Sequence, residues 1–144
     1  MVRMISVFST LILAAFAAAV PLQTRQVGNA QCQIDRKKIV LNLIATSSAV
    51  GKIDTTDPTT ATAVQAAEAG LKSAAQGILA IAAELKSGQN ASAMDRDQVG
   101  AGLTAVQTAL TGINDPTVNA TVTNALDKLS KTIAAGQAVV ADCK

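Results

Sequence analysis

Two cysteines are the residues of this chain whose type and position most directly indicate chemistry. Cys32 and Cys143 stand at the two edges of the helically patterned region, and the chain has no other cysteine. In a secreted chain such a pair predicts a disulfide, which in the chain-entropy model stabilises a loop of this length by about 4–5 kcal/mol. Two separate buried thiols are the alternative, which the expected positions just outside the first and last helices disfavour.

The residues that commonly support catalysis are missing. The chain has no histidine, the usual general acid or base near neutral pH, and oxidised cysteines supply no thiolate nucleophile. No serine is followed by the S-x-x-K pattern, and Asp95 and Asp97, two apart, do not share a helix face. We therefore expect no catalytic residue, no cofactor and no enzyme activity.

A metal site is not expected either. Asp54 and Asp57 share a turn and could hold a calcium ion weakly. Calcium, however, requires six or more oxygens at defined spacing, so a helix cap and a solvated loop are the favoured interpretation. The chain also shows no zinc-ligand spacing and no glycine-rich phosphate loop.

Two sequons predict N-linked sugar. Asn90-Ala91-Ser92 falls in an expected turn, and Asn119-Ala120-Thr121 falls in the first turns of the last expected helix. A threonine cluster is also a candidate for O-linked sugar, although its members are equally consistent with ordinary turn and helix-start residues: Thr55, Thr56, Thr59, Thr60 and Thr62.

The first nineteen residues have the features of a secretory signal peptide. Arg3 precedes the mostly apolar run from Ile5 to Phe16, and Ala17–Ala19 offers a cleavage site. A retained membrane anchor is the alternative, but a spanning helix needs about 20 apolar residues and this run ends at Pro21. We expect a signal peptide over 1–19, a short extension or propeptide over 20–31, and one folded domain over 32–144, secreted to the medium or cell wall.

The chain beyond the signal peptide does not resemble a nucleic-acid-binding protein. From Val20 onward it has eleven Lys and Arg against ten Asp and Glu, a net charge of +1. Both phenylalanines, Phe8 and Phe16, precede that point, and Tyr and Trp are absent. The one basic run, Arg36 to Lys38, is typical of a solvated helix start rather than of a clustered basic face.

Four stretches repeat apolar residues at steps of three and four, which predicts four amphipathic helices. Their stripes are Ile39, Leu43, Val50 and Ile53; Val64, Ala67, Leu71, Ala74, Ile78, Ile81 and Leu85; Val99, Leu103, Val106, Leu110 and Ile113; and Val118, Val122, Ala125, Leu129, Thr132, Gly136 and Val139. No useful length alternates with period two, so no sheet is expected.

Boundary signals agree with this division. Asp57-Pro58 and Asp115-Pro116 each predict an N-cap followed by proline at the first helical position, Gly88 a helix end, and Ser92 with Asp95 a capping-box variant. Six other glycines are expected inside helices, where they permit close backbone approach: Gly70, Gly77, Gly100, Gly102, Gly112 and Gly136.

The two halves of the chain resemble each other. Asp35-Arg36 and Leu43 match Asp95-Arg96 and Leu103 at an offset of 60, and Asp57-Pro58-Thr59 matches Asp115-Pro116-Thr117 at an offset of 58. We therefore predict an all-α, up-down-up-down four-helix bundle built from a duplicated helical hairpin, with its termini joined by a disulfide. In that topology the first and last helices bring Cys32 and Cys143 to the same end.

The chain resembles the fungal hydrophobic surface-binding protein A family, also called cell wall galactomannoproteins. The resemblance covers roughly residues 33–142 and lies in the leader, the aromatic-poor Ala/Thr/Val/Leu composition and repeated helical segments such as Ala63 to Leu85 and Gly102 to Leu110. It implies a secreted or wall-associated glycoprotein that adsorbs to hydrophobic solids or binds lipid, helping to recruit hydrolases.

Two functional expectations follow. The first is a non-catalytic protein that binds a hydrophobic surface, a lipid or a fatty acid, either through exposed helix faces or by holding an acyl chain between helices. The second is a structural wall protein or a host-interaction effector with a protein or polysaccharide partner. A bundle bridged by a disulfide has to expose its apolar stripes by loosening rather than by separating. The oligomeric state is open.

Overall fold

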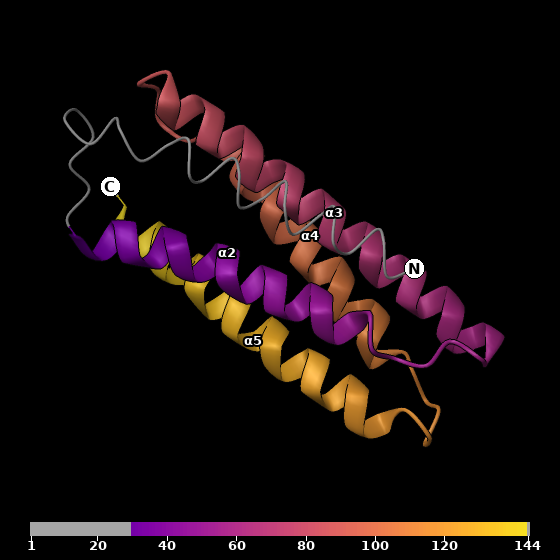
Figure 1. Cartoon of the computed structure of the whole chain (residues 1–144). Coiled ribbons are helices and arrows are strands. Elements are labelled where there is room, and N and C mark those ends of the chain that lie inside the picture. The colour runs from indigo at the N-terminus through magenta and orange to yellow at the C-terminus, as the bar shows by residue number, and fades with distance from the viewer. Residues whose placement is uncertain (1–29, 144) are drawn as a thin grey trace.

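The computed structural model describes residues 30–143, which fold into four α-helices without a strand (Figure 1). The predicted signal peptide, residues 1–19, and residues 20–29 of the predicted extension lie outside the described residues. The helices are α2 (Ala30–Val50), α3 (Pro58–Lys86), α4 (Ala93–Thr111) and α5 (Asn119–Asp142). The all-α prediction and the count of four helical stretches are thus confirmed for this part of the chain.

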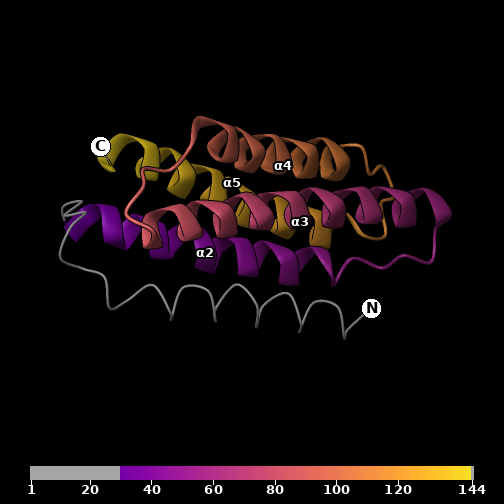
Figure 2. The ribbon, with the colours of Figure 1, turned by 90° about the horizontal axis from the view of Figure 1, so that it is seen from above.

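Successive helices run in opposite directions, as expected for an up-down-up-down bundle. Seen from above, α2 lies on one side of the molecule and α4 on the opposite side (Figure 2). The helices do not pack evenly, however. α2 packs mainly on α5 and α3 mainly on α4, whereas α2 touches α3 lightly and α4 touches α5 lightly. In Figure 1 these two pairs draw apart toward the end where α2 begins and α3 ends.

This pairing has a simple relation to the internal repeat. The first copy supplies α2 and α3, and the second copy supplies α4 and α5. Each closely packed pair therefore contains one helix from each copy. In the repeat α2 corresponds to α4 and α3 to α5, so the α2–α5 pair corresponds to the α3–α4 pair. The duplicated hairpins are consequently interlocked, because each copy buries its apolar stripes mainly against the other copy.

The core is built from small and medium aliphatic side chains of all four helices. Leu43, Val106, Leu110 and Leu129 are each at most 2% exposed. The predicted stripes supply most of this core, as periodicity of 3.6 residues requires. Two members of the predicted stripes are buried but lie in turns rather than in helices: Ile53, 4% exposed after the end of α2 at Val50, and Val118, 3% exposed just before α5.

One polar contact lies inside the α2–α5 pair. The hydroxyls of Thr46 and Thr132 are both fully buried and 2.9 Å apart. Each hydroxyl is also within hydrogen-bond distance of the carbonyl oxygen four residues earlier in its own helix. These distances are 2.9 Å from Thr46 to Asn42 and 3.0 Å from Thr132 to Lys128. Whichever hydroxyl donates across the pair, the other donates to its own helix, so both protons are used and neither buried oxygen lacks a partner.

The α3–α4 pair depends on glycine instead. A Cβ placed on Gly102 would lie 2.7 Å from the Gly70 carbonyl oxygen and 2.6 Å from the Ala74 nitrogen. A Cβ on Gly77 would lie 2.7 Å from a Val99 methyl carbon. These separations are too short for real carbon contacts, so the two backbones approach as closely as they do because no side chain stands between them.

Most predicted helix boundaries are confirmed. Asp57 caps α3 by accepting a hydrogen bond from the Thr60 N–H at 2.7 Å, with Pro58 at the first helical position. Ser92 caps α4 by accepting from the Asp95 N–H at 3.1 Å. At the end of α3, Gly88 takes a φ of +80° and the Gln89 N–H bonds the Glu84 carbonyl, the Schellman arrangement.

Three details of the prediction were wrong. Asp115-Pro116 does not open the last helix, since α5 begins at Asn119. The Asp115 carboxylate instead accepts from the Thr117 N–H and hydroxyl, which closes a turn before the helix. Cys32 lies inside α2 rather than before it, and Gly112 caps α4 from outside. At Asp115 and Gly112 a turn stands where the sequence pattern predicted helix, and at Cys32 the helix begins earlier than the pattern predicted.

We call the close approach of α3 and α4 at Gly70, Gly77 and Gly102 the glycine seam. Alanine substitutions at two nearby glycines of α4 should change the free energy of unfolding in opposite directions. Gly102→Ala should lower the free energy of unfolding by about 1–3 kcal/mol, because its methyl group meets α3 backbone. Gly100→Ala, where a Cβ meets nothing within 4 Å, should raise it by about 0.5–1 kcal/mol through helix propensity. Urea unfolding followed by circular dichroism measures both, and equal effects would contradict the close packing of α3 on α4.

Candidate functional site: the disulfide end and the apolar surfaces

The disulfide joins the first turn of α2 to the residue after α5. Cys32 and Cys143 are bonded, with their Cα atoms 5.0 Å apart and a sequence separation of 111. Cys32 is completely buried. The predicted bond is therefore confirmed, and it fastens the same pair, α2 with α5, that the buried threonines join further along.

A buried carboxylate lies one turn from this bond. Asp35 is 2% exposed, and both of its oxygens accept from the Gln31 side-chain amide at 3.0 Å. The Lys38 ammonium lies 3.1 Å away. The hydrogen bond from Gln31, helped by Lys38 and opposed by burial, holds the pKa of Asp35 below its ordinary value. The hydrogen-bonding needs of the buried Asp35 carboxylate are thus met within the fold. This geometry gives Asp35 a structural role at the end of the bundle closed by the disulfide, which we call the clasp.

The acidic residues considered for calcium are used in the turn. Asp54 accepts from the Thr56 N–H at 2.9 Å and from its hydroxyl at 2.6 Å, and this hydroxyl lowers the pKa of Asp54. Asp57 caps α3, and the Thr60 N–H lowers its pKa. Across residues 30–143, no three His, Cys, Asp or Glu side chains come together as a metal site would require.

The asparagine of each predicted sequon is exposed. Asn90 lies in the turn that joins α3 to α4, and Asn119 is the first residue of α5. In the threonine cluster Thr56, Thr59 and Thr62 are exposed, but Thr60 is 2% exposed and is not accessible to a transferase. Attachment of sugar to the exposed members remains a prediction.

Large apolar side chains on the surface were the feature that periodicity alone missed. Ile34 and Leu41 on α2 are 45% and 59% exposed, Met94 at the start of α4 is 75% exposed, and Val140 near the end of α5 is 59% exposed. Ile34 and Leu41 are seven residues apart, and this spacing would have marked them as one line on the helix. The sequence pattern identified only the stripe through Ile39 and Leu43, on the opposite side of the helix, as the apolar face.

A second apolar row runs along α5 beside its core stripe. Val122 is buried, Leu126 and Ile133 are partly buried against the core, and Val140 is exposed. Steps of four and seven keep these residues on one flank of the helix. Their exposure therefore increases in the direction in which the two helix pairs draw apart in Figure 1.

A shallow, open hollow lies between the start of α3 and the end of α4. It is lined by threonine hydroxyls and small side chains without a charged group, from Pro58, Thr59, Thr62, Ala63, Ala66, Thr108, Ala109 and Gly112. The Thr62 and Thr108 hydroxyls each donate to the carbonyl four residues earlier in their own helix, so their oxygens can still accept a hydrogen bond.

The basic run at the start of α2 is mostly solvated, as expected. Lys37 and Lys38 are exposed, whereas Arg36 is half-buried and its partial burial lowers the pKa of its guanidinium. No helix within the described residues has the length and hydropathy that a membrane span requires. Comparison with protein-family models, curated proteins and solved structures found no match.

Removing the disulfide should weaken the fold measurably. We expect Cys32→Ser with Cys143→Ser to lower the free energy of unfolding by about 2–4 kcal/mol, since the reduced chain regains the entropy of a long open loop. The oxidised protein in urea gives the reference, and the wild type under reductant should approach the double variant. An unchanged urea midpoint in both would show that the clasp does not restrain unfolding.

Acid should weaken the fold through the same end of the bundle. A carboxylate whose pKa is lowered on folding stabilises the protein above its unfolded pKa, and this contribution is lost as the pH falls through its folded pKa. The urea midpoint should thus decrease between about pH 5 and about pH 2. Asp35→Asn should make this decrease smaller, whereas Asp127→Asn on the surface should leave it as in the wild type; identical profiles for all three would contradict the role of Asp35.

Proposed function

We propose that this protein is a secreted, non-catalytic helical protein that binds hydrophobic surfaces or lipid, in the medium or at a cell wall. The observation that supports this most is the apolar row on α5, whose exposure rises from Val122 to Val140 as the helix pairs separate. A row continuous with the core gives an apolar ligand a route to buried side chains, which scattered surface residues do not provide.

The packing indicates which parts would move. The α2–α5 pair is joined by the disulfide and the threonine hydroxyls, and the α3–α4 pair by the glycine seam. Between the pairs the direct helix contacts are light. Loosening would therefore widen the space between intact pairs, and the clasped ends of α2 and α5 would stay together. Such a movement would expose apolar side chains between the pairs without breaking the disulfide.

Retention on an apolar solid tests the proposal. The protein, recovered from a secreting host, should be retained by polystyrene beads and should bind a long-chain fatty acid at moderate salt. Val140→Asp should reduce retention by about tenfold, because a charge replaces apolar area at the exposed end of the row.

Ala141→Asp provides the matched control, since Ala141 is the next residue and is exposed on α5 outside the row. It should change retention by less than about twofold. Absence of wild-type retention on both polystyrene and the fatty acid would remove the proposed function, and equal effects of the two substitutions would remove the role of the row.

A structural wall protein or a host-interaction effector is the second candidate. The hydroxyl-lined hollow between α3 and α4 and the exposed sequons favour it, since both suit polar contacts with a protein or polysaccharide. This function predicts recovery of one specific partner in a pull-down and indifference to polystyrene. Thr62→Val with Thr108→Val should then weaken that recovery.

A further inference from the structure

Helix α2 has an apolar line on its outer side. Ile34 and Leu41 lie two turns apart and are 45% and 59% exposed. Helical geometry places them opposite Ile39 and Leu43, which face the core. A helix with apolar residues on both sides usually contacts something on both sides. The inner side of α2 contacts α5, and within residues 30–143 no helix covers the outer line.

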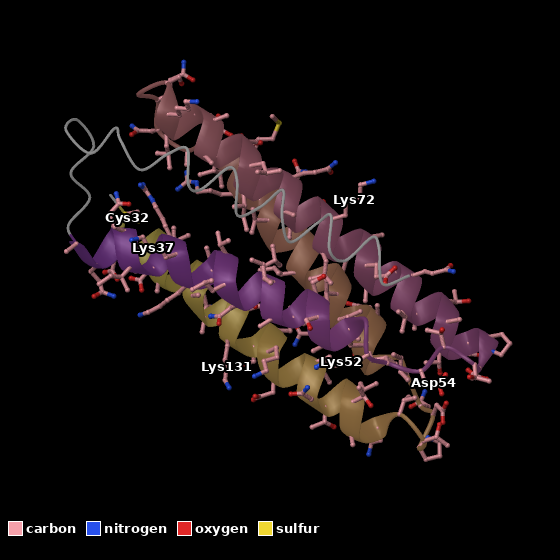
Figure 3. All side chains as sticks on the ribbon, in the orientation of Figure 1. Cys32, Lys37, Lys52, Asp54, Lys72 and Lys131 are labelled. Atoms are coloured by element: carbon pink, nitrogen blue, oxygen red, sulfur yellow. A yellow bond between two sulfur atoms is a disulfide. The ribbon has the colours of Figure 1, made fainter. Side chains whose placement is uncertain are left out.

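Two lysines flank this line. Lys37 and Lys38 follow Ile34 by three and four residues, so they project to its two sides between Ile34 and Leu41. Lys37 is exposed on α2 near the disulfide end (Figure 3), and Lys38 is 54% exposed while its ammonium contacts the buried Asp35. We call Ile34, Lys37, Lys38 and Leu41 the α2 outer stripe. Apolar residues flanked by lysine are the pattern of helices that lie in a membrane interface.

Within residues 30–143, the positive charge is concentrated on the helix pair that carries the α2 outer stripe. Helices α2 and α5 carry five Lys and Arg against three Asp, a net charge of +2. Helices α3 and α4 carry three against four, a net charge of −1, and the turns 51–57 and 112–118 carry one Lys against three Asp, a net charge of −2. An anionic surface therefore attracts the helix pair that bears the α2 outer stripe and repels the rest.

Met94, the most exposed large apolar residue within residues 30–143, has different surroundings. It stands at the start of α4, where Asp97, three residues on, shares its helix face, while the Arg96 guanidinium between the two aspartates donates to the Ser92 carbonyl. A neutral apolar solid would accept either location, but an anionic surface distinguishes them. Charge complementarity thus selects both the face and the kind of surface.

We propose that the α2 outer stripe docks on an anionic lipid bilayer, with Ile34 and Leu41 entering the boundary between headgroups and acyl chains. Lys37 and Lys38 contact the anionic headgroups on either side. This inference rests on the proposed function and adds the docking face and the charge of the surface. Because the face is small, the contact is reversible and weakens as salt screens the lysines.

Vesicle flotation tests the inference. The disulfide-bonded protein from a secreting host is mixed with vesicles of phosphatidylcholine alone or of phosphatidylcholine with phosphatidylglycerol. Binding should require phosphatidylglycerol and decrease with salt. Ile34→Ser with Leu41→Ser should lower the partition coefficient by about tenfold, and Lys37→Glu with Lys38→Glu by at least about tenfold.

Matched controls lie on the other helix pair. Met94→Ser removes an apolar residue that is more exposed than Leu41, and Lys72→Glu reverses an exposed charge on α3, labelled in Figure 3. Both should bind within about twofold of the wild type. Circular dichroism of each variant confirms that it is folded, so that a loss of binding reports the surface.

The outcomes separate this inference from the proposed function. Retention on polystyrene without binding to anionic vesicles overturns the docking on lipid and leaves the proposed function standing. Equal binding to both vesicle types, or an equal loss in Met94→Ser, also overturns it. No retention on polystyrene, fatty acid or either vesicle removes both, whereas loss only in the α2 variants on anionic vesicles supports it.

Discussion

The arrangement of this protein depends on the packing of each helix against a helix of the other repeat. Neither hairpin buries its own stripes, because α2 and α3 touch only lightly, as do α4 and α5. The apolar faces are covered by the pairs α2–α5 and α3–α4, so the two copies must fold together. The disulfide links the two ends of this interlocked chain, and it does so within a pair that already packs closely.

The two pairs reach close packing by different means, although the repeat relates them. Gly70 and Gly102 bring the α3 and α4 backbones together. The matching residues of the other pair are Lys128 and Asn42, which carry long or polar side chains where α3 and α4 carry glycine. A disulfide, a buried hydroxyl pair and the hydrogen bond from Asn42 to the Lys131 carbonyl, at 3.3 Å, join that pair instead. The two pairs thus occupy equivalent places in the repeat but are held together by different chemistry.

Close packing within pairs and light packing between them give the fold its functional character. Under the proposed function, an all-aliphatic core without aromatic residues would favour ligands recognised by apolar area rather than by shape. Polar groups are concentrated where they hold the frame: Asp35 at the clasp, Asp54 and Asp115 in the two turns, Asp57 and Ser92 at helix starts.

The sequence by itself determined the four helices, the duplication, the disulfide and most caps, because periodicity, proline, glycine and cysteine act locally or through topology. It did not determine which helices pack closely, since both copies carry equivalent stripes and only three-dimensional contact shows that Gly70 meets Gly102. It also misplaced the start of α5, where the Asp115 turn replaced a cap. The spacing of Ile34 and Leu41 places them on one line, but only the tertiary structure decided that no neighbouring helix in the described part of the chain covers this line.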